Sequence, residues 1–270
     1  MLLNGQPASE ITLLDRGLAY GDGLFETILV HRGKPVFLAE HLTRLQHGCQ
    51  QLGMQLDLAA LQSELASILA SQAGSDCVLK VMVTRHAGGR GYRPASTACN
   101  RILSLHAAPD YRQQHPEQGI AAFVCRQRLS RQPALAGLKH MNRLEQVLAS
   151  REWPDESFME GVMLDTDGLV IEGTRSNLFA VMDGKLLTPD LSQSGVNGVM
   201  RAVLLKHFGS AVTVATFTLA ELRQAQEIFV CNSINGIWPL LSLQSMDEKW
   251  HFAVGPRARQ AQACFEEALV

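Results

Sequence analysis

Hydrophobic residues along the chain either alternate with polar ones or recur at helical spacing, and the two patterns predict different elements. Residues 24–38 alternate around a polar turn at 32–34, which predicts two strands. Apolar residues three or four positions apart then predict a helix over 39–54. The other elements expected in this half are a helix over 58–72 and buried strands over 77–85 and 101–107.

The second half of the chain carries more strand patterns and stronger turn signals. Asp167-Gly168 separates the apolar runs 161–165 and 169–173, and Asp183-Gly184 separates two more. Asp-Gly between apolar runs is typical of a tight β-hairpin. The other elements expected here are a strand over 227–233 and helices over 141–152, 198–208 and 256–268.

A polar segment with two prolines, residues 109–119, separates these halves and is the best linker candidate. The sequence therefore predicts an α/β (α+β) protein with two domains. The smaller N-terminal domain would cover 1–108 and the larger, strand-rich C-terminal domain would cover 120–270.

Charge and cysteine usage exclude several classes of function. The net charge of −2, with acids and bases interspersed, gives no basic surface for nucleic acid or for a membrane. The six cysteines form no C-x-x-C pair, which argues against a zinc site or a disulfide framework. No signal peptide or membrane-spanning run is recognised, so a cytoplasmic protein with no metal is expected.

Two residues could carry covalent or acid–base chemistry. Lys139 lies among apolar residues just before a predicted helix, where an amine can lose its charge and form a Schiff base. Most lysines are solvated surface charges, and the local pattern alone does not decide between these readings. Glu172 ends a predicted strand and could face a cleft, although an exposed glutamate gives the same pattern.

Three segments could bind an anion. The glycine-containing run 195–201 opens a predicted helix, whose first N–H groups suit a phosphate, and residues 231–233 end a strand. Arg44, between two leucines of a predicted helix, could supply the charge. The loop 88–92 carries one arginine and one tyrosine and suits a small carboxylate. Each of these segments could equally be an ordinary loop with no ligand.

The order of these features resembles the fold-type IV pyridoxal 5'-phosphate (PLP) enzymes over nearly the whole chain. This group holds branched-chain aminotransferases, D-amino acid aminotransferases and aminodeoxychorismate lyases. The motifs that carry the resemblance are residues 21–27, Arg44, Lys139, Glu172-Gly-Thr-Arg-Ser-Asn177, Gly195-Val-Asn197 and Asn232-Ser233. Residues 88–92, 135–148 and 195–201 look most like the lyases, and Leu144 stands where branched-chain aminotransferases usually carry tyrosine.

The resemblance implies a two-domain fold with the cofactor between the domains, and a role for each matched residue. Lys139 would be the Schiff-base lysine and move protons, and Glu172 would pair with the pyridine nitrogen. The phosphate would be held by Arg44, by the amides of Val196 and Asn197, and by Ser233. Other implied contacts are Ser176 and Asn232 with the cofactor, and Phe25, Thr27, Arg90 and Tyr92 with the substrate.

The activity implied is conversion of 4-amino-4-deoxychorismate to 4-aminobenzoate and pyruvate, a step towards folate, by a homodimer. The alternative is an aminotransferase for branched-chain or D-amino acids, which would use the same lysine and glutamate. A scaffold that has lost its cofactor is a third class. The joint presence of Lys139, Glu172 and Arg44 argues against that third class.

Overall fold

In the computed structural model, which describes residues 1–70, 74–88, 91–111 and 115–270, the chain forms two compact units. The first holds Met1–Pro109 together with Leu138–Asn142, and the second holds Asp110–Gly137 together with Arg143–Val270. The chain therefore returns to the first unit for five residues in the middle of the second. The boundaries 1–108 and 120–270 expected from the sequence stay a prediction.

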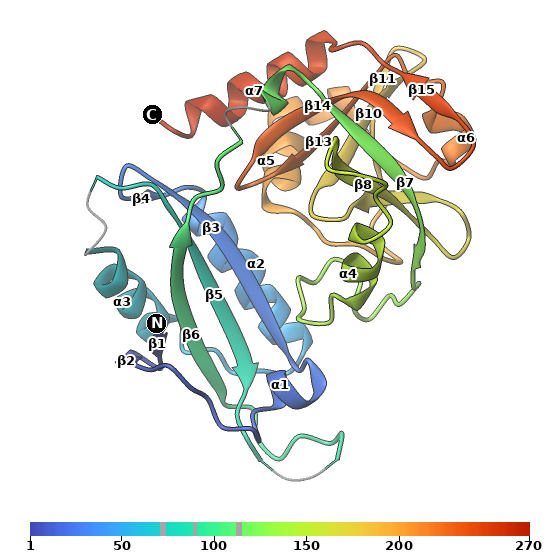
Figure 1. The fold of residues 1–270 in the computed structure, drawn as a ribbon. Helices are drawn as coiled ribbons and strands as arrows, with labels where there is room; N and C mark the ends of the chain where they lie inside the picture. Colours follow the sequence, from blue (N-terminus) through green and yellow to red (C-terminus); the bar gives the residue numbers. More distant parts are fainter. Residues whose placement is uncertain (71–73, 89–90, 112–114) are drawn as a thin grey trace. The chain divides into compact units, whose positions relative to one another are not determined.

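The first unit is a six-stranded antiparallel sheet in the order β2-β1-β6-β5-β3-β4, with helices beside it (Figure 1). Its elements are β1 (Leu2–Leu3), β2 (Gln6–Pro7), α1 (Arg16–Tyr20), β3 (Gly23–His31), β4 (Lys34–Pro35), α2 (Leu38–Gln51), α3 (Leu58–Ala70), β5 (Cys77–Arg85) and β6 (Cys99–Ala107).

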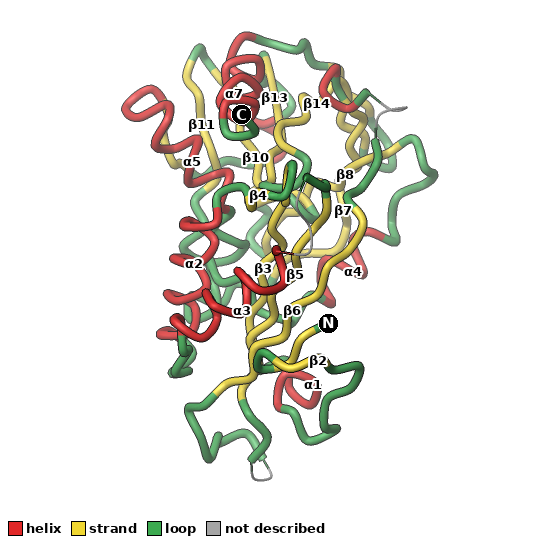
Figure 2. The backbone as a smooth tube through the Cα atoms, turned by 90° about the vertical axis from the view of Figure 1, so that its left-hand side faces the viewer, coloured by secondary structure: helices red, strands yellow, loops and turns green. Residues whose placement is uncertain are grey.

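Strand β3 has two different faces, one buried and one only partly buried. Leu24, Glu26 and Ile28 are buried, whereas Phe25 and Thr27 between them are only partly buried. Successive side chains of a strand point to opposite faces of its sheet. The buried face is covered by α2, which both Figure 1 and Figure 2 show lying along the strand.

The second unit is a nine-stranded mixed sheet in the order β12-β11-β10-β13-β14-β7-β8-β9, with β15 paired to β14. Strand β13 is buried along nearly its whole length, and α5 and α7 pack against it. Its elements are η1 (Pro116–Gln118), β7 (Ile120–Leu129), α4 (Leu144–Ser150), β8 (Phe158–Asp165), β9 (Val170–Gly173), β10 (Asn177–Met182), β11 (Lys185–Pro189), α5 (Val199–Phe208), η2 (Gly209–Ala211), β12 (Val212–Ala215), α6 (Leu219–Leu222), β13 (Glu227–Asn232), β14 (Gly236–Gln244), β15 (Lys249–His251) and α7 (Pro256–Glu267).

Most of the predicted elements are confirmed. The two Asp-Gly turns join β8 to β9 and β10 to β11, as the hairpin signals indicate. The second strand of the first predicted hairpin is wrong in length, because β4 has only two residues before α2 begins at Leu38. No helix of the described residues is long and apolar enough to cross a membrane.

Candidate active site

Lys139 lies on a short segment that pairs with β3. The Phe25 N–H group donates to the Lys139 carbonyl at 3.0 Å, and the Met141 N–H group donates to the Gly23 carbonyl at 3.0 Å. The Asn142 side-chain amide donates to the Gly21 carbonyl at 3.2 Å. These bonds hold Lys139 and the residues that follow it against β3 and the turn before it.

The partly buried face of β3 collects the groups that could meet a substrate. The Lys139 Nζ lies 4.5 Å from the ring centroid of Phe25, and the Lys80 Nζ lies 5.6 Å from the same centroid. Thr27 is the cross-strand partner of Lys80, so its side chain is on this face too. Lys80 was not found from the sequence, although a lysine inside the apolar run 77–85 was a usable signal.

Arg44 belongs to the opposite, α2-covered face of β3. Its Nε and Nη2 donate to the two carboxylate oxygens of Glu26 at 2.8 and 2.5 Å. The His41 Nδ1 lies 2.6 Å from Glu26 Oε2, and both His41 and Glu26 are buried. Burial alone would raise the pKa of Glu26, but the charge and hydrogen bonds of Arg44, with His41, lower it to about 2.

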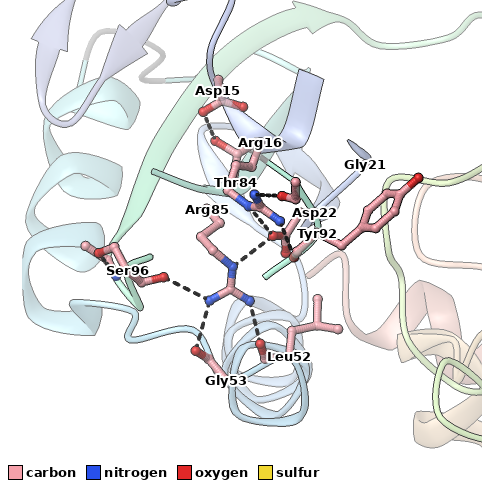
Figure 3. A network of polar contacts seen from close by, with 12 residues as sticks. Asp15, Arg16, Gly21, Asp22, Leu52, Gly53, Thr84, Arg85, Tyr92 and Ser96 are labelled. Carbon is pink, nitrogen blue, oxygen red and sulfur yellow. Dashed lines mark hydrogen bonds and ion pairs between the residues drawn. The ribbon is translucent and has the colours of Figure 1, made fainter. Parts of the chain in front are cut away.

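A second arginine network shapes the start of β3 (Figure 3). Asp22 accepts from Arg16 Nε and from Arg85 Nε, both at 2.9 Å. Arg16 also donates to the Gly91 and Tyr92 carbonyls at 2.9 and 2.8 Å, which ties these two residues to the network. Tyr92 is 88% exposed, and the other substrate residue expected here, Arg90, lies outside the described residues.

Glu172, in the second unit, is a buried carboxylate with a fixed position. It lies just before Gly173, the last residue of β9, and its Oε2 accepts from the Val196 N–H group at 2.8 Å. The Asn177 side-chain amide donates to the Val196 carbonyl at 2.9 Å. A Cβ on Gly195, whose φ is +85°, would lie 3.2 Å from Glu172 Oε2, so glycine allows this close approach.

The Val196 and Asn197 amides, expected at a phosphate, both have protein acceptors in the structure. Val196 N–H already donates to Glu172, and Asn197 N–H donates to the Gly137 carbonyl at 3.0 Å. Helix α5 begins only at Val199, with Gly198 as its N-cap. The first turn of a helix leaves its N–H groups without intrahelical acceptors, so the Val199 and Met200 N–H groups are further donors that could meet an anion.

Ser176 and Asn232 both make internal hydrogen bonds. Ser176 Oγ donates to Glu160 Oε2 at 2.7 Å, and Glu160 also accepts from the Thr174 N–H group at 2.9 Å. Asn232 Oδ1 accepts from two main-chain N–H groups, those of residues 234 and 235, and so shapes the turn after β13. Ser233 follows in the same turn and is buried. Glu160, the buried partner of Ser176, was missed from the sequence.

Comparison with known proteins places these features in a family. The model of the class IV amino-transferases matches residues 23–243. The chain belongs to the class IV amino-transferase family. An aminodeoxychorismate lyase of Vibrio harveyi is 35% identical over 266 residues, covering 96% of this chain and 97% of the relative.

A solved structure supports the same assignment of fold. The crystal structure of 4-amino-4-deoxychorismate lyase from Pseudomonas aeruginosa has a TM-score of 0.92 and 47% identity, covering 98% of each chain. A putative branched-chain-amino-acid aminotransferase of Methanocaldococcus jannaschii is 30% identical over 89% of this chain and 86% of the relative. The class IV amino-transferase family therefore includes relatives with two kinds of reaction.

Class IV amino-transferases and their lyase relatives depend on PLP, and PLP is the cofactor of this chain. The residues present fit that group chemically. The first unit offers the Lys139 amine, and the second offers a fixed carboxylate at Glu172 and a helix N-terminus at Val199. The described residues contain no cluster of three or more His, Cys, Asp or Glu side chains that could hold a metal ion.

Proposed function

We propose that this chain is a PLP-dependent aminodeoxychorismate lyase, converting 4-amino-4-deoxychorismate to 4-aminobenzoate and pyruvate. The observation that carries the proposal is nearly full-length similarity to two such lyases, at 35% identity in sequence and 47% identity in a solved structure. This reaction is a step towards folate.

The cofactor would be held by residues from several segments of the chain. Lys139 would bind PLP covalently through Nζ, and Glu172 would hold a proton on the pyridine nitrogen. Arg44, Ser233 and the main-chain N–H groups of Val199 and Met200 would bind the phosphate. When bound, PLP supplies a sink for the electrons released as a proton leaves the substrate.

Lys139 would also move the protons of the reaction. Its amine would remove the proton from the ring carbon that bears nitrogen. A proton delivered to the methylene carbon of the enolpyruvyl group then breaks the carbon–oxygen bond to the ring. Pyruvate leaves, and the ring becomes aromatic. The main-chain bonds to Gly23 and Phe25 support this role, because they fix the Lys139 backbone beside β3.

The substrate carries two carboxylates, and the partly buried face of β3 would meet them. Lys80 has no carboxylate partner among the described residues and lies on the same face as Phe25 and Thr27. An amine placed there suits a substrate carboxylate. Tyr92, exposed on its tethered loop, is the other described residue expected at the substrate, together with Arg90.

Two further expectations are the oligomeric state of the protein and its location in the cell. We expect a homodimer, which the exposed apolar side chains of Leu13, Leu14 and Leu18 support. We also expect a cytoplasmic location. All six cysteines are free thiols, as is usual in a reducing compartment.

An aminotransferase is the second candidate, because the branched-chain relative is 30% identical. Leu144, the fifth residue after Lys139, argues against it, since branched-chain aminotransferases usually carry a tyrosine there. The two reactions also differ in their needs. A transaminase requires a keto acid to take up the amino group, whereas a lyase regenerates its cofactor without a second substrate.

The test is incubation of the PLP-loaded enzyme with aminodeoxychorismate and no keto acid, with 4-aminobenzoate as the readout. We expect sustained product formation, and we expect Lys139→Ala to abolish both this activity and the trapping of PLP on the protein by borohydride. Amino-acid turnover that depends on 2-oxoglutarate or pyruvate, with no aromatic product, would instead support the aminotransferase.

A further inference from the structure

Helix α2 presents Arg44 to a carboxylate on the neighbouring strand. Glu26, on β3, is 1% exposed, and its two oxygens accept from Arg44 Nε at 2.8 Å and Nη2 at 2.5 Å. This is a two-point contact along one edge of the planar guanidinium.

The carboxylate of Glu26 is itself fixed. His41 lies one helical turn before Arg44, is fully buried, and places Nδ1 2.6 Å from Glu26 Oε2. Helix and strand also pack closely, because a Cβ on Gly48 would come within 2.8 Å of the Leu24 side chain. The close packing of α2 against β3 therefore fixes the Glu26 carboxylate. This carboxylate in turn holds the long and otherwise flexible side chain of Arg44.

We propose that Glu26 is a positioning residue that holds the Arg44 guanidinium in the orientation needed to bind the phosphate of PLP. The proposal rests on the proposed function, in which Arg44 is a phosphate ligand. A free arginine must give up much of its rotamer freedom when it binds an anion. An arginine already held by Glu26 has given up that freedom on folding.

The charge of Glu26 should weaken phosphate binding, whereas its positioning of Arg44 should strengthen it, so the two effects can be separated by experiment. The negative Glu26 opposes the binding of any anion at Arg44. If Glu26 were only a countercharge, Glu26→Gln would strengthen phosphate binding and Glu26→Asp would leave it unchanged. If Glu26 positions Arg44, Glu26→Asp weakens binding, because the charge remains but the shorter side chain loses the two-point contact.

The experiment compares the affinities of PLP and of pyridoxal, which lacks the phosphate. For Glu26→Asp we expect the affinity for PLP to fall about tenfold, the low end for loss of an outer-shell partner, while that for pyridoxal stays near wild type. The matched control is Glu64→Asp. Glu64 is also buried and also holds an arginine, Arg101, with contacts of 3.1 and 2.7 Å in the same unit.

The route through Arg44 is tested in the same assay. In an Arg44→Ala background, Glu26→Asp should cause no further loss of PLP affinity. His41→Leu keeps the charges of Glu26 and Arg44 but removes one donor to Glu26. This variant should lower the ratio of PLP affinity to pyridoxal affinity by a smaller factor than Glu26→Asp does. It also tests the proposal if Glu26→Asp does not fold.

Several outcomes would overturn the proposal. One is a ratio of PLP affinity to pyridoxal affinity that is unchanged or increased in Glu26→Asp and His41→Leu. Others are an equal loss of affinity for both ligands, or an equal change of the ratio in Glu64→Asp. The last is a loss of PLP affinity that Glu26→Asp still causes in the Arg44→Ala background. Failure of the proposed function looks different. In that case the wild-type protein would not bind PLP, or Arg44→Ala would not alter the affinity ratio.

Discussion

Glu172 combines a negative charge with a fixed position, since the Val196 N–H group donates to its Oε2 and Gly195 leaves room for the contact. A carboxylate held in this way does not need to reorganise when a positive group approaches it. Such preorganised charge is usually the largest electrostatic contribution that an enzyme makes.

Glu172→Gln should therefore separate cofactor binding from catalysis. Glutamine keeps an oxygen that can accept from Val196, but it cannot balance a proton on the pyridine nitrogen. We expect PLP still to bind, by absorbance titration, while kcat falls on the order of a hundredfold. The matched control is Glu152→Gln, because Glu152 also accepts from main-chain N–H groups, at 2.6 and 2.8 Å. Near-normal kcat in Glu172→Gln would rule out this role.

At the residue scale, the order of motifs predicts roles for Lys139 and Glu172, but it does not indicate the neighbours that hold them. Glu26 and Glu160 are far in sequence from Arg44 and Ser176, the residues that they bind. Their importance follows only from pairing in space. The acceptor of the Val196 amide is hidden for the same reason, because it is a side chain twenty-four residues earlier in the chain.

At the scale of elements, the contact between α2 and β3 depends on the ionised form of Glu26. Its pKa in the folded state is about 2, below the value of 4.5 for an unperturbed group. A lowered folded pKa gives stability that is present above the unfolded pKa and is lost as the pH falls towards the folded pKa. The stabilising effect of the Glu26–Arg44 contact should therefore fade between pH 4.5 and about 2.

This pH dependence is measurable as a difference between two proteins. Glu26→Gln should lower the free energy of urea unfolding relative to wild type near neutral pH. The difference should shrink steadily as the pH drops below 4.5. A difference that stayed constant down to about pH 3 would show that ionisation of Glu26 does not stabilise the fold.

Local patterns predicted helices and hairpins well, and long-range pairing poorly. The Asp-Gly turns identify β8–β9 and β10–β11 because a hairpin is specified within a dozen residues. The parallel pairs of β7 with β8 and with β14 have no such signal. The segment around Lys139 reads as the approach to a helix, and its bonds to β3 come from residues more than a hundred positions earlier.

At the scale of the whole molecule, the division into units has a consequence for the proposed chemistry. Lys139 belongs to the first unit, although the chain on both sides of it belongs to the second. The proposed lysine therefore cannot be provided by a fragment that ends at residue 109. The proposed cofactor residues are spread from Arg44 to Ser233, which agrees with the nearly full-length match to the lyase relatives.

The expected homodimer gives the last prediction. Leu13 and Leu14 are adjacent leucines that are 82% and 74% exposed, an unusual cost for a surface that faces only water. If they lie in the interface between two copies, the double change Leu13→Glu and Leu14→Glu buries two charges there and should give a monomer of 29.6 kDa by sedimentation. The control is Met246→Glu, at a 68% exposed apolar residue of the second unit, which should leave the mass unchanged. A double variant that keeps the wild-type mass would place the interface elsewhere.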